Sequence, residues 1–214
     1  MSLRIDTRDE ALPERLFDDT LRAVRRIGPR ASYWRTFWFP LGAEPGCLPE
    51  KAACKLARFV PERSRIVGVE WWIGRMRTDA VTLDFHHDRD LALFEATGRI
   101  SHPRWSSVLY LNRVKGGSLF VTDQRLRRRG DEYRLVPEEP GDFALAHPEP
   151  NRFVRFPGQL LHGVLDQNDR PPTRSNEKGG GALRLSLVIN WWTRRPRAIP
   201  RWSAEIAYPE LAID

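Results

Sequence analysis

The sequence predicts a mainly β protein of the jelly-roll kind, preceded by helices. From Ile66 onward the chain consists of short segments rich in β-branched and aromatic residues. Gly, Pro, Asn and Asp separate these segments at the short intervals that are typical of an all-β sandwich or barrel. Before Ile66, apolar residues recur at helical spacing in two stretches. A chain of 214 residues, 41% of them hydrophobic, is long enough to bury one substantial core.

Two helices are predicted before the β region. The first falls within residues 9–28, where apolar side chains share one helical face and Gly28 provides a common stop. The second runs from about Leu48 to Val60, and the aromatic stretch SYWRTFWFPLG between the two is expected to be extended. We therefore expect residues 1–65 to form an N-terminal helical segment that packs on a β core of residues 66–214 within a single domain.

The β core is predicted to contain nine strands and one long loop. In chain order the strand segments are IVGVEWWIGRM, AVTLDFH, SSVLYLNRV, GSLFVTD, DEYRLVP, GDFALAH, NRFVRFP, QLLHGVL and ALRLSLVINWW. Alternate residues of a strand point to opposite faces, so Trp71 and Trp72 are expected on different sides of the first of them. The Pro- and Gly-rich segment 166–181 is expected to be a mobile loop at the rim of a functional site.

The charge composition raises the question of a nucleic-acid partner. The formal net charge is +7 and the pI is about 10.0. Only four residues are lysine, which indicates a general bias toward arginine rather than a phosphate-binding surface. The densest cluster, QRLRRRGDEYR at 124–134, contains acidic residues and is expected to be a solvated hairpin or loop. A nucleic-acid partner is therefore not expected.

Cysteine content and hydropathy bear on location. Cys47 and Cys54 are expected to be reduced thiols because their spacing does not match a zinc site and no secretory signal precedes them. The first residues carry charges throughout, and no apolar run approaches the length of about 18 residues that a membrane span requires. We expect a cytoplasmic protein without a membrane partner, and the sequence leaves the oligomeric state open.

Several polar side chains recur within apolar strand patterns. In VTLDFHHDRD, His86 and Asp88 are two residues apart and would share a strand face, whereas His87 would face away. His162 interrupts the apolar segment LLHGVLD. Arg184 and Ser186 share one face of the last strand, and a buried arginine is costly unless it meets an anion. Taken alone, the histidines and Asp88 could be metal ligands or ordinary polar and core residues of strands, and an anion is expected near Arg184.

Taken in their order along the chain, these motifs resemble those of the iron(II)- and 2-oxoglutarate-dependent oxygenases, in the branch that includes the prolyl hydroxylases. The resemblance covers roughly residues 70–192. It rests on HHD, VLYLN, GGSLF, PGDFALAHP, FPGQLLHGV and RLSL taken together. It implies that the jelly roll is a double-stranded β-helix, the cupin-like form of that barrel. It also implies a hydroxylase that converts 2-oxoglutarate to succinate and carbon dioxide.

The resemblance implies a role for each candidate residue. His86, Asp88 and His162 would hold Fe(II) as a facial triad, leaving positions for 2-oxoglutarate and O2. Arg184 would pair with the distal carboxylate of 2-oxoglutarate, and Ser186 and Tyr110 would form hydrogen bonds to it. Ascorbate is an optional reductant in this scheme.

Two departures from the family pattern leave parts of this site open. Many relatives carry a tyrosine about ten residues before the first ligand, where this chain has RMR at 75–77, so the group at the C1 carboxylate end is unidentified. Arg184 follows His162 by 22 residues because the long loop intervenes, which keeps Arg170 and Arg174 as alternative anchors.

Several readings of the function stay open. The substrate of an oxygenase could be a peptidyl side chain, a free amino acid or a natural-product intermediate, because fold and cosubstrate do not choose among them. A non-catalytic jelly-roll binding domain is one alternative. A nucleic-acid demethylase is another, although Arg184 is followed six residues later by Asn190 and not by a second arginine.

Overall fold

The computed structural model describes Leu3, residues 5–172 and residues 181–213. Residues 173–180 of the loop predicted at 166–181 lie outside these ranges, and Arg174 is among them. The helices are α1 (Glu14–Ile27), α2 (Leu48–Leu56) and α3 (Leu91–Thr97). The strands are β1 (Asp6–Arg8), β2 (Phe37–Pro40), β3 (Gly68–Arg77), β4 (Trp105–Tyr110), β5 (Leu119–Arg129), β6 (Glu132–Val136), β7 (Phe143–Ala146), β8 (Phe153–Pro157), β9 (Leu160–Val164) and β10 (Leu183–Trp192).

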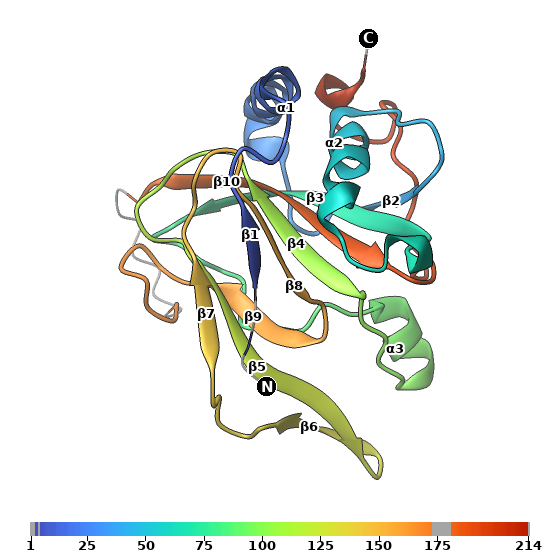
Figure 1. Ribbon diagram of the computed structural model, residues 1–214, viewed down its shortest axis with the longest axis vertical. Coiled ribbons are helices and arrows are strands. Elements are labelled where there is room, and N and C mark those ends of the chain that lie inside the picture. The colour runs from blue at the N-terminus through green and yellow to red at the C-terminus, as the bar shows by residue number, and fades with distance from the viewer. Residues whose placement is uncertain (1–2, 4, 173–180, 214) are drawn as a thin grey trace.

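The strands form two antiparallel sheets, so the prediction of a mainly β protein is confirmed (Figure 1). The larger sheet has six strands in the order β1-β8-β4-β10-β3-β2. In the smaller sheet β5 lies between β6 and β7 and also pairs with β9. Apolar side chains from β4 and β8 meet those from β5, β7 and β9 in a core between the two sheets.

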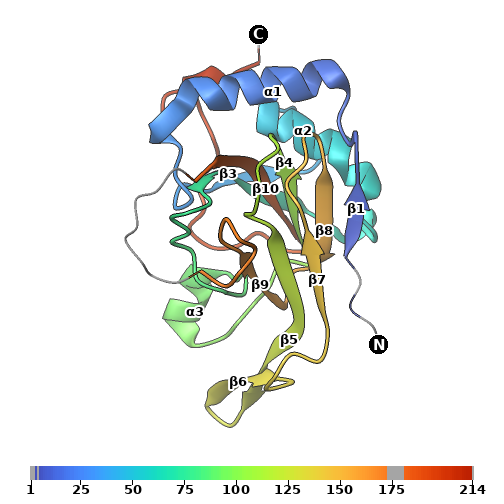
Figure 2. The same ribbon diagram turned by 90° about the vertical axis from the view of Figure 1, so that its left-hand side faces the viewer.

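Helices α1 and α2 cover the other face of the larger sheet (Figures 1 and 2). The core beneath them is continuous and includes both helices together with β3 and β10. The two faces of strand β3 have different surroundings. Trp71 is buried in the core on the helix side, whereas Trp72 lines cavities on the opposite side. Among the helices of the described residues, none has the length and apolar character needed to cross a membrane.

The N-terminal segment contributes strands as well as helices. Strand β1 pairs with β8 and strand β2 pairs with β3, at opposite edges of the larger sheet. Helix α1 begins after Pro13, later than the start of the predicted stretch, and ends at Gly28 as expected. Strands this short carry too little alternation to be recognised in a sequence, which is why β1 was not predicted.

The segment AVTLDFH is not a strand, which corrects the prediction. Residues 81–85 belong to no strand, and His86 forms an isolated bridge with His162. The chain then enters helix α3, which was not predicted either. Asp90 begins this helix: its Oδ1 accepts a hydrogen bond of 3.0 Å from the backbone N–H of Leu93, a standard N-cap. Asp90 is thus a capping residue.

The arginine-rich cluster forms the hairpin of β5 and β6, as expected, with Gly130 at its turn. The hairpin projects from the end of the molecule opposite α1 (Figures 1 and 2). The hydroxyl of Tyr133 accepts a hydrogen bond from the backbone N–H of Ile100, which fixes the hairpin to the segment after α3.

Candidate metal centre

His86 and His162 are brought together by a single backbone bridge. The N–H of each residue donates to the C=O of the other, at 2.8 and 3.0 Å. The two imidazole rings consequently lie side by side, with centroids 4.5 Å apart. A smaller feature supports this bridge: a side chain at Gly163 would collide with the ring of Phe85, the neighbour of His86.

Substituting Gly163 should therefore disturb the bridge. A Cβ at this position would lie 2.0 Å from Cδ1 of Phe85, so Gly163→Ala must displace that ring and the backbone beside His86. We expect a loss of about 1–3 kcal/mol in stability together with weaker binding of Mn(II), measured by thermal unfolding and metal titration. Gly46→Ala is the control, because its Cβ would make only ordinary contacts, at 3.6 Å or more. Equal metal affinity in both variants would contradict this account.

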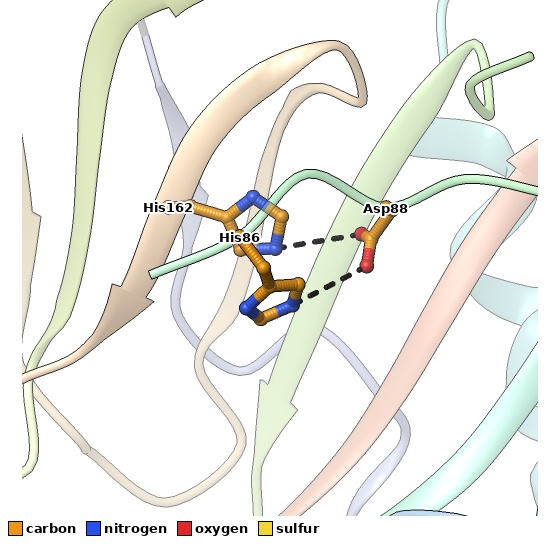
Figure 3. A group of neighbouring side chains, drawn as sticks. All are labelled: His86, Asp88 and His162. Atoms are coloured by element: carbon orange, nitrogen blue, oxygen red, sulfur yellow. Dashed lines mark ion pairs between the residues drawn. The ribbon is translucent and has the colours of Figure 1, made fainter. Parts of the chain in front are cut away.

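Asp88 completes a group of three candidate ligands (Figure 3). Its Oδ1 lies 3.6 Å from Nε2 of His86, and its Oδ2 lies 3.5 Å from Nε2 of His162. One ligand atom from each of the three residues lies within 4.8 Å of the others. His87 is not part of the group. The predicted convergence of His86, Asp88 and His162 is therefore present, although the first two lie on an extended segment rather than a strand.

The second ring nitrogens orient the two imidazoles. Nδ1 of His86 contacts the carbonyl of Asp84 at 2.9 Å, and Nδ1 of His162 contacts the carbonyl of Leu160 at 2.9 Å. Each Nδ1–H can donate to its carbonyl, which leaves the lone pair on Nε2 directed at the shared point. Carbonyl or carboxylate partners of this kind usually fix the tautomer of metal-binding histidines. The donor set fits a divalent transition metal.

Burial and charge act oppositely on the ligands. Burial alone would raise the pKa of the Asp88 carboxyl, but His162, His86 and a hydrogen bond from the Ser106 hydroxyl hold that pKa well below its usual range. Burial lowers the pKa of His162. Asp88 is therefore an anion and His162 a neutral imidazole at neutral pH, which are the protonation states that bind metals.

Arg184 forms the centre of a second polar group. Its side chain is buried with 2% exposure. Its Nη1 donates to the hydroxyls of Ser186 at 3.3 Å and Tyr33 at 3.4 Å, and its guanidinium lies 5.0 Å from the centre of the Tyr110 ring. Within the described ranges, Nε of Arg184 has no hydrogen-bond partner and no carboxylate pairs with the guanidinium. A buried cation surrounded by hydroxyl groups fits an anionic ligand.

Tyr110 and Tyr33 differ from the sequence expectation. The hydroxyl of Tyr110 donates to the carbonyl of Ala146 at 2.8 Å and accepts from the N–H of Leu119 at 3.3 Å. Its ring, not its proton, therefore faces the Arg184 group in this structure. Tyr33 was not identified from the sequence, because the stretch between α1 and β2 was expected to be extended, whereas Tyr33 and Trp34 form a turn before the strand begins at Phe37.

A cleft of about 390 Å³ leads to the metal-binding group. It shares Tyr33, Trp72, Leu83 and His86 with a smaller cavity that also contains Asp88 and His162. Glu70, Trp34 and residues of α3 form other parts of its lining. A ligand in the cleft would therefore be able to contact His86, the member of the triad that lines it.

Glu70 gives the cleft a measurable pH dependence. Burial and the charge of Asp88 raise the pKa of Glu70 from its ordinary 4.5 to about 7. Between these values the folded protein keeps a proton that the unfolded chain releases, so stability falls as the pH rises through this window. Glu70→Gln should reduce the loss of unfolding free energy between pH 5 and 8 by about 1–3 kcal/mol in the metal-free protein. Urea unfolding at both pH values tests this, with exposed Glu205→Gln as the control; the same pH dependence in wild type and Glu70→Gln would refute it.

Other polar side chains of the β core and its loops have structural partners. Asn112 donates to the carbonyl of Leu183 and accepts from the N–H of Leu185, both at 2.8 Å, so it extends the β10 pairing. Nδ1 of His102 lies 2.6 Å from the backbone oxygen of Asp88. His147 contacts the hydroxyl of Ser118 at 2.7 Å. Arg170 is an exposed loop residue.

Comparison with solved structures establishes the fold. A prolyl-4-hydroxylase from Pseudomonas putida has a TM-score of 0.55 and 18% identity, over 90% of this chain and 94% of that one. A prolyl hydroxylase from Trichoplax adhaerens, in complex with a peptide fragment of the hypoxia inducible factor oxygen degradation domain, has a TM-score of 0.54 and 13% identity, over 91% and 86%. A prolyl 4-hydroxylase from Phytophthora capsici has a TM-score of 0.50 and 14% identity, over 96% and 67%. No family model matches the sequence, and no curated protein matches it.

Proposed function

We propose that this chain is an iron(II)- and 2-oxoglutarate-dependent oxygenase, a hydroxylase built on a double-stranded β-helix. One observation carries the proposal: two imidazoles and a carboxylate converge beside a cleft, in a fold whose interior also holds a buried arginine that pairs with no carboxylate among the described residues. The first group suits a divalent iron and the second suits the distal carboxylate of a 2-oxo acid. The likeness in fold to prolyl hydroxylases supports the same reading.

Each residue has a physical role in this mechanism. His86 and His162 would bind the metal through Nε2, and Asp88 through a carboxylate oxygen that the hydroxyl of Ser106 holds in place. The metal with its cosubstrates would supply the oxidising chemistry. Arg184 would orient 2-oxoglutarate by a planar, charge-assisted pair, with the hydroxyl of Ser186 beside it. Apolar side chains of Val108, Phe156 and Val188 next to the triad would limit the access of water.

The substrate would occupy the cleft in front of His86. Its volume of about 390 Å³ suits a single side chain or a small molecule. A peptidyl side chain is supported by the peptide bound to the Trichoplax adhaerens protein. A free amino acid or a natural-product intermediate fits the same volume, so the experiment must offer all of these substrate classes.

Mass spectrometry of succinate tests the proposal. Purified protein with Fe(II) and 2-oxoglutarate should form succinate slowly alone and faster with its substrate, supplied as pools of peptides, amino acids and oligonucleotides. His162→Ala should form none. A wild-type protein that binds metal but neither binds nor consumes 2-oxoglutarate would instead support a non-catalytic binding domain. Stimulation by the oligonucleotide pool alone would support the demethylase alternative.

A further inference from the structure

Tyr33 reaches the interior from outside both sheets. It lies between α1 and β2, yet its hydroxyl oxygen is 3.4 Å from Nη1 of Arg184, which is 151 positions away in the sequence. Its side chain lines the triad cavity as well as the outer cleft. Tyr33 therefore contacts the buried arginine and also lines the cavity of the metal-binding group.

Gly74 makes this approach possible. In the pairing of β3 with β10, Gly74 lies opposite Ser186. A Cβ at Gly74 would be 2.3 Å from Oγ of Ser186 and 2.9 Å from the hydroxyl oxygen of Tyr33. Any larger residue would therefore occupy the place of the phenol. The missing side chain on β3 and the phenol supplied by the N-terminal segment are complementary.

The two tyrosines beside Arg184 use their protons differently. Tyr110 donates its proton to the carbonyl of Ala146. The oxygen of Tyr33 accepts from Arg184, and in the part of the chain that the structure describes the other hydrogen-bond partner of its phenol is the Ser186 hydroxyl, not a carbonyl or carboxylate. Burial raises the pKa of Tyr33, so the phenol is protonated at neutral pH. Tyr33 is thus a hydrogen-bond donor poised beside a buried cation, the arrangement that a carboxylate requires.

We infer that Tyr33 is a positioning residue for the cosubstrate, donating its phenol proton to the distal carboxylate of 2-oxoglutarate next to Arg184. The inference rests on the proposed function and extends it. It gives Tyr33 the role that the sequence resemblance implied for Tyr110, and it makes the N-terminal segment part of the cosubstrate pocket. Tyr110 then supports Arg184 with its ring and holds β7 with its hydroxyl.

Calorimetric titration of the Mn(II)-loaded protein separates the two ends of the ligand. 2-Oxoglutarate probes the metal and the carboxylate pocket together, whereas oxalate chelates the metal without a distal carboxylate. Tyr33→Phe should bind 2-oxoglutarate about tenfold to a hundredfold more weakly, the usual effect of losing a hydrogen bond to a charged group. Its affinity for oxalate should be unchanged. Tyr133→Phe, which alters a phenol on the distant hairpin, is the matched control.

A second variant tests the fit between Gly74 and Tyr33. Gly74→Ala should also weaken binding of 2-oxoglutarate and leave oxalate unaffected. If the alanine acts by displacing the phenol, the double variant should be little worse than the weaker-binding single variant, since neighbouring residues that share one interaction are not additive. Thermal unfolding of each variant verifies that it is folded before the titration.

The outcomes distinguish this inference from the proposed function. Wild-type protein that binds Mn(II) and oxalate but not 2-oxoglutarate would overturn both. If the wild-type protein and the Tyr33→Phe variant bind 2-oxoglutarate with equal affinity, only the role of Tyr33 is overturned. A larger loss in Tyr110→Phe than in Tyr33→Phe would return that role to Tyr110. Equal losses for 2-oxoglutarate and oxalate in Tyr33→Phe would place its effect at the metal and refute the inference.

Discussion

We expect the His162→Ala variant to lose both metal binding and succinate formation. His162 is buried, and its Nε2 lies 3.5 Å from Oδ2 of Asp88, so it supplies one of three ligands. Replacing even an outer-shell partner of a metal ligand commonly costs about tenfold to a hundredfold in affinity, and losing a ligand should cost more. Titration with Mn(II) or Co(II) followed by calorimetry measures the loss directly.

His87→Ala is the control for this experiment. His87 is adjacent to a ligand and is partly buried, but it does not belong to the metal-binding group. It should therefore keep its metal affinity and its turnover. The triad would be disproved if both variants bound Mn(II) with the affinity of the wild-type protein.

Arg184→Ala should raise the dissociation constant of 2-oxoglutarate far more than that of the metal. Truncating one partner of a buried charged pair costs about 2–5 kcal/mol, or roughly thirtyfold to several thousandfold in affinity. The substitution removes no partner of the two imidazoles, which contact the carbonyls of Asp84 and Leu160. Calorimetry of the Mn(II)-loaded protein is the appropriate measurement.

The Arg184→Met variant provides an independent test of the role of Arg184, based on thermal stability. Among the described residues no carboxylate pairs with the buried guanidinium, and a well-packed apolar replacement of such a group is often neutral or stabilising. The Met variant should therefore unfold at the same or a higher temperature without ligand, while 2-oxoglutarate should stabilise only the wild-type protein. Arg170→Ala, at an exposed loop residue, should behave as wild type. If the Arg170→Ala variant instead loses its affinity for 2-oxoglutarate, the residue that binds the distal carboxylate lies in the loop.

The sequence was most informative where the structure depends on residues close together in the chain. Alternation and turn residues located β3 and β10, and they placed Arg184 and Ser186 on one face because a strand repeats every two residues. The same local logic failed for AVTLDFH, whose β-branched residues favour a strand although the structure places the segment outside the strands, with an isolated bridge at His86. Helix α3 was missed because seven residues show little periodicity, and its signal was the cap at Asp90.

The order of the metal ligands could be predicted, but their supporting contacts could not. Histidine and aspartate in a familiar order indicated the triad before any geometry was known. The role of Tyr33 depends on a contact with Arg184 across 151 positions and on the space left by Gly74. Neither feature has a local pattern, so only the folded chain reveals them.

The placement of β1 and β2 at the two edges of the larger sheet has a consequence for how the protein folds. Asp6 pairs with Arg155, and Phe37 pairs with Trp71, so β1 is made long before its partner whereas β2 meets its partner early. Pairings across such sequence distances form slowly, because the entropy of closing a long loop must be overcome first. Until β1 docks, the edge of β8 is open to pairing with another chain, a known route to aggregation. The early residues of the polypeptide thus complete the sheet last, and the yield of folded protein should depend on how quickly they do so.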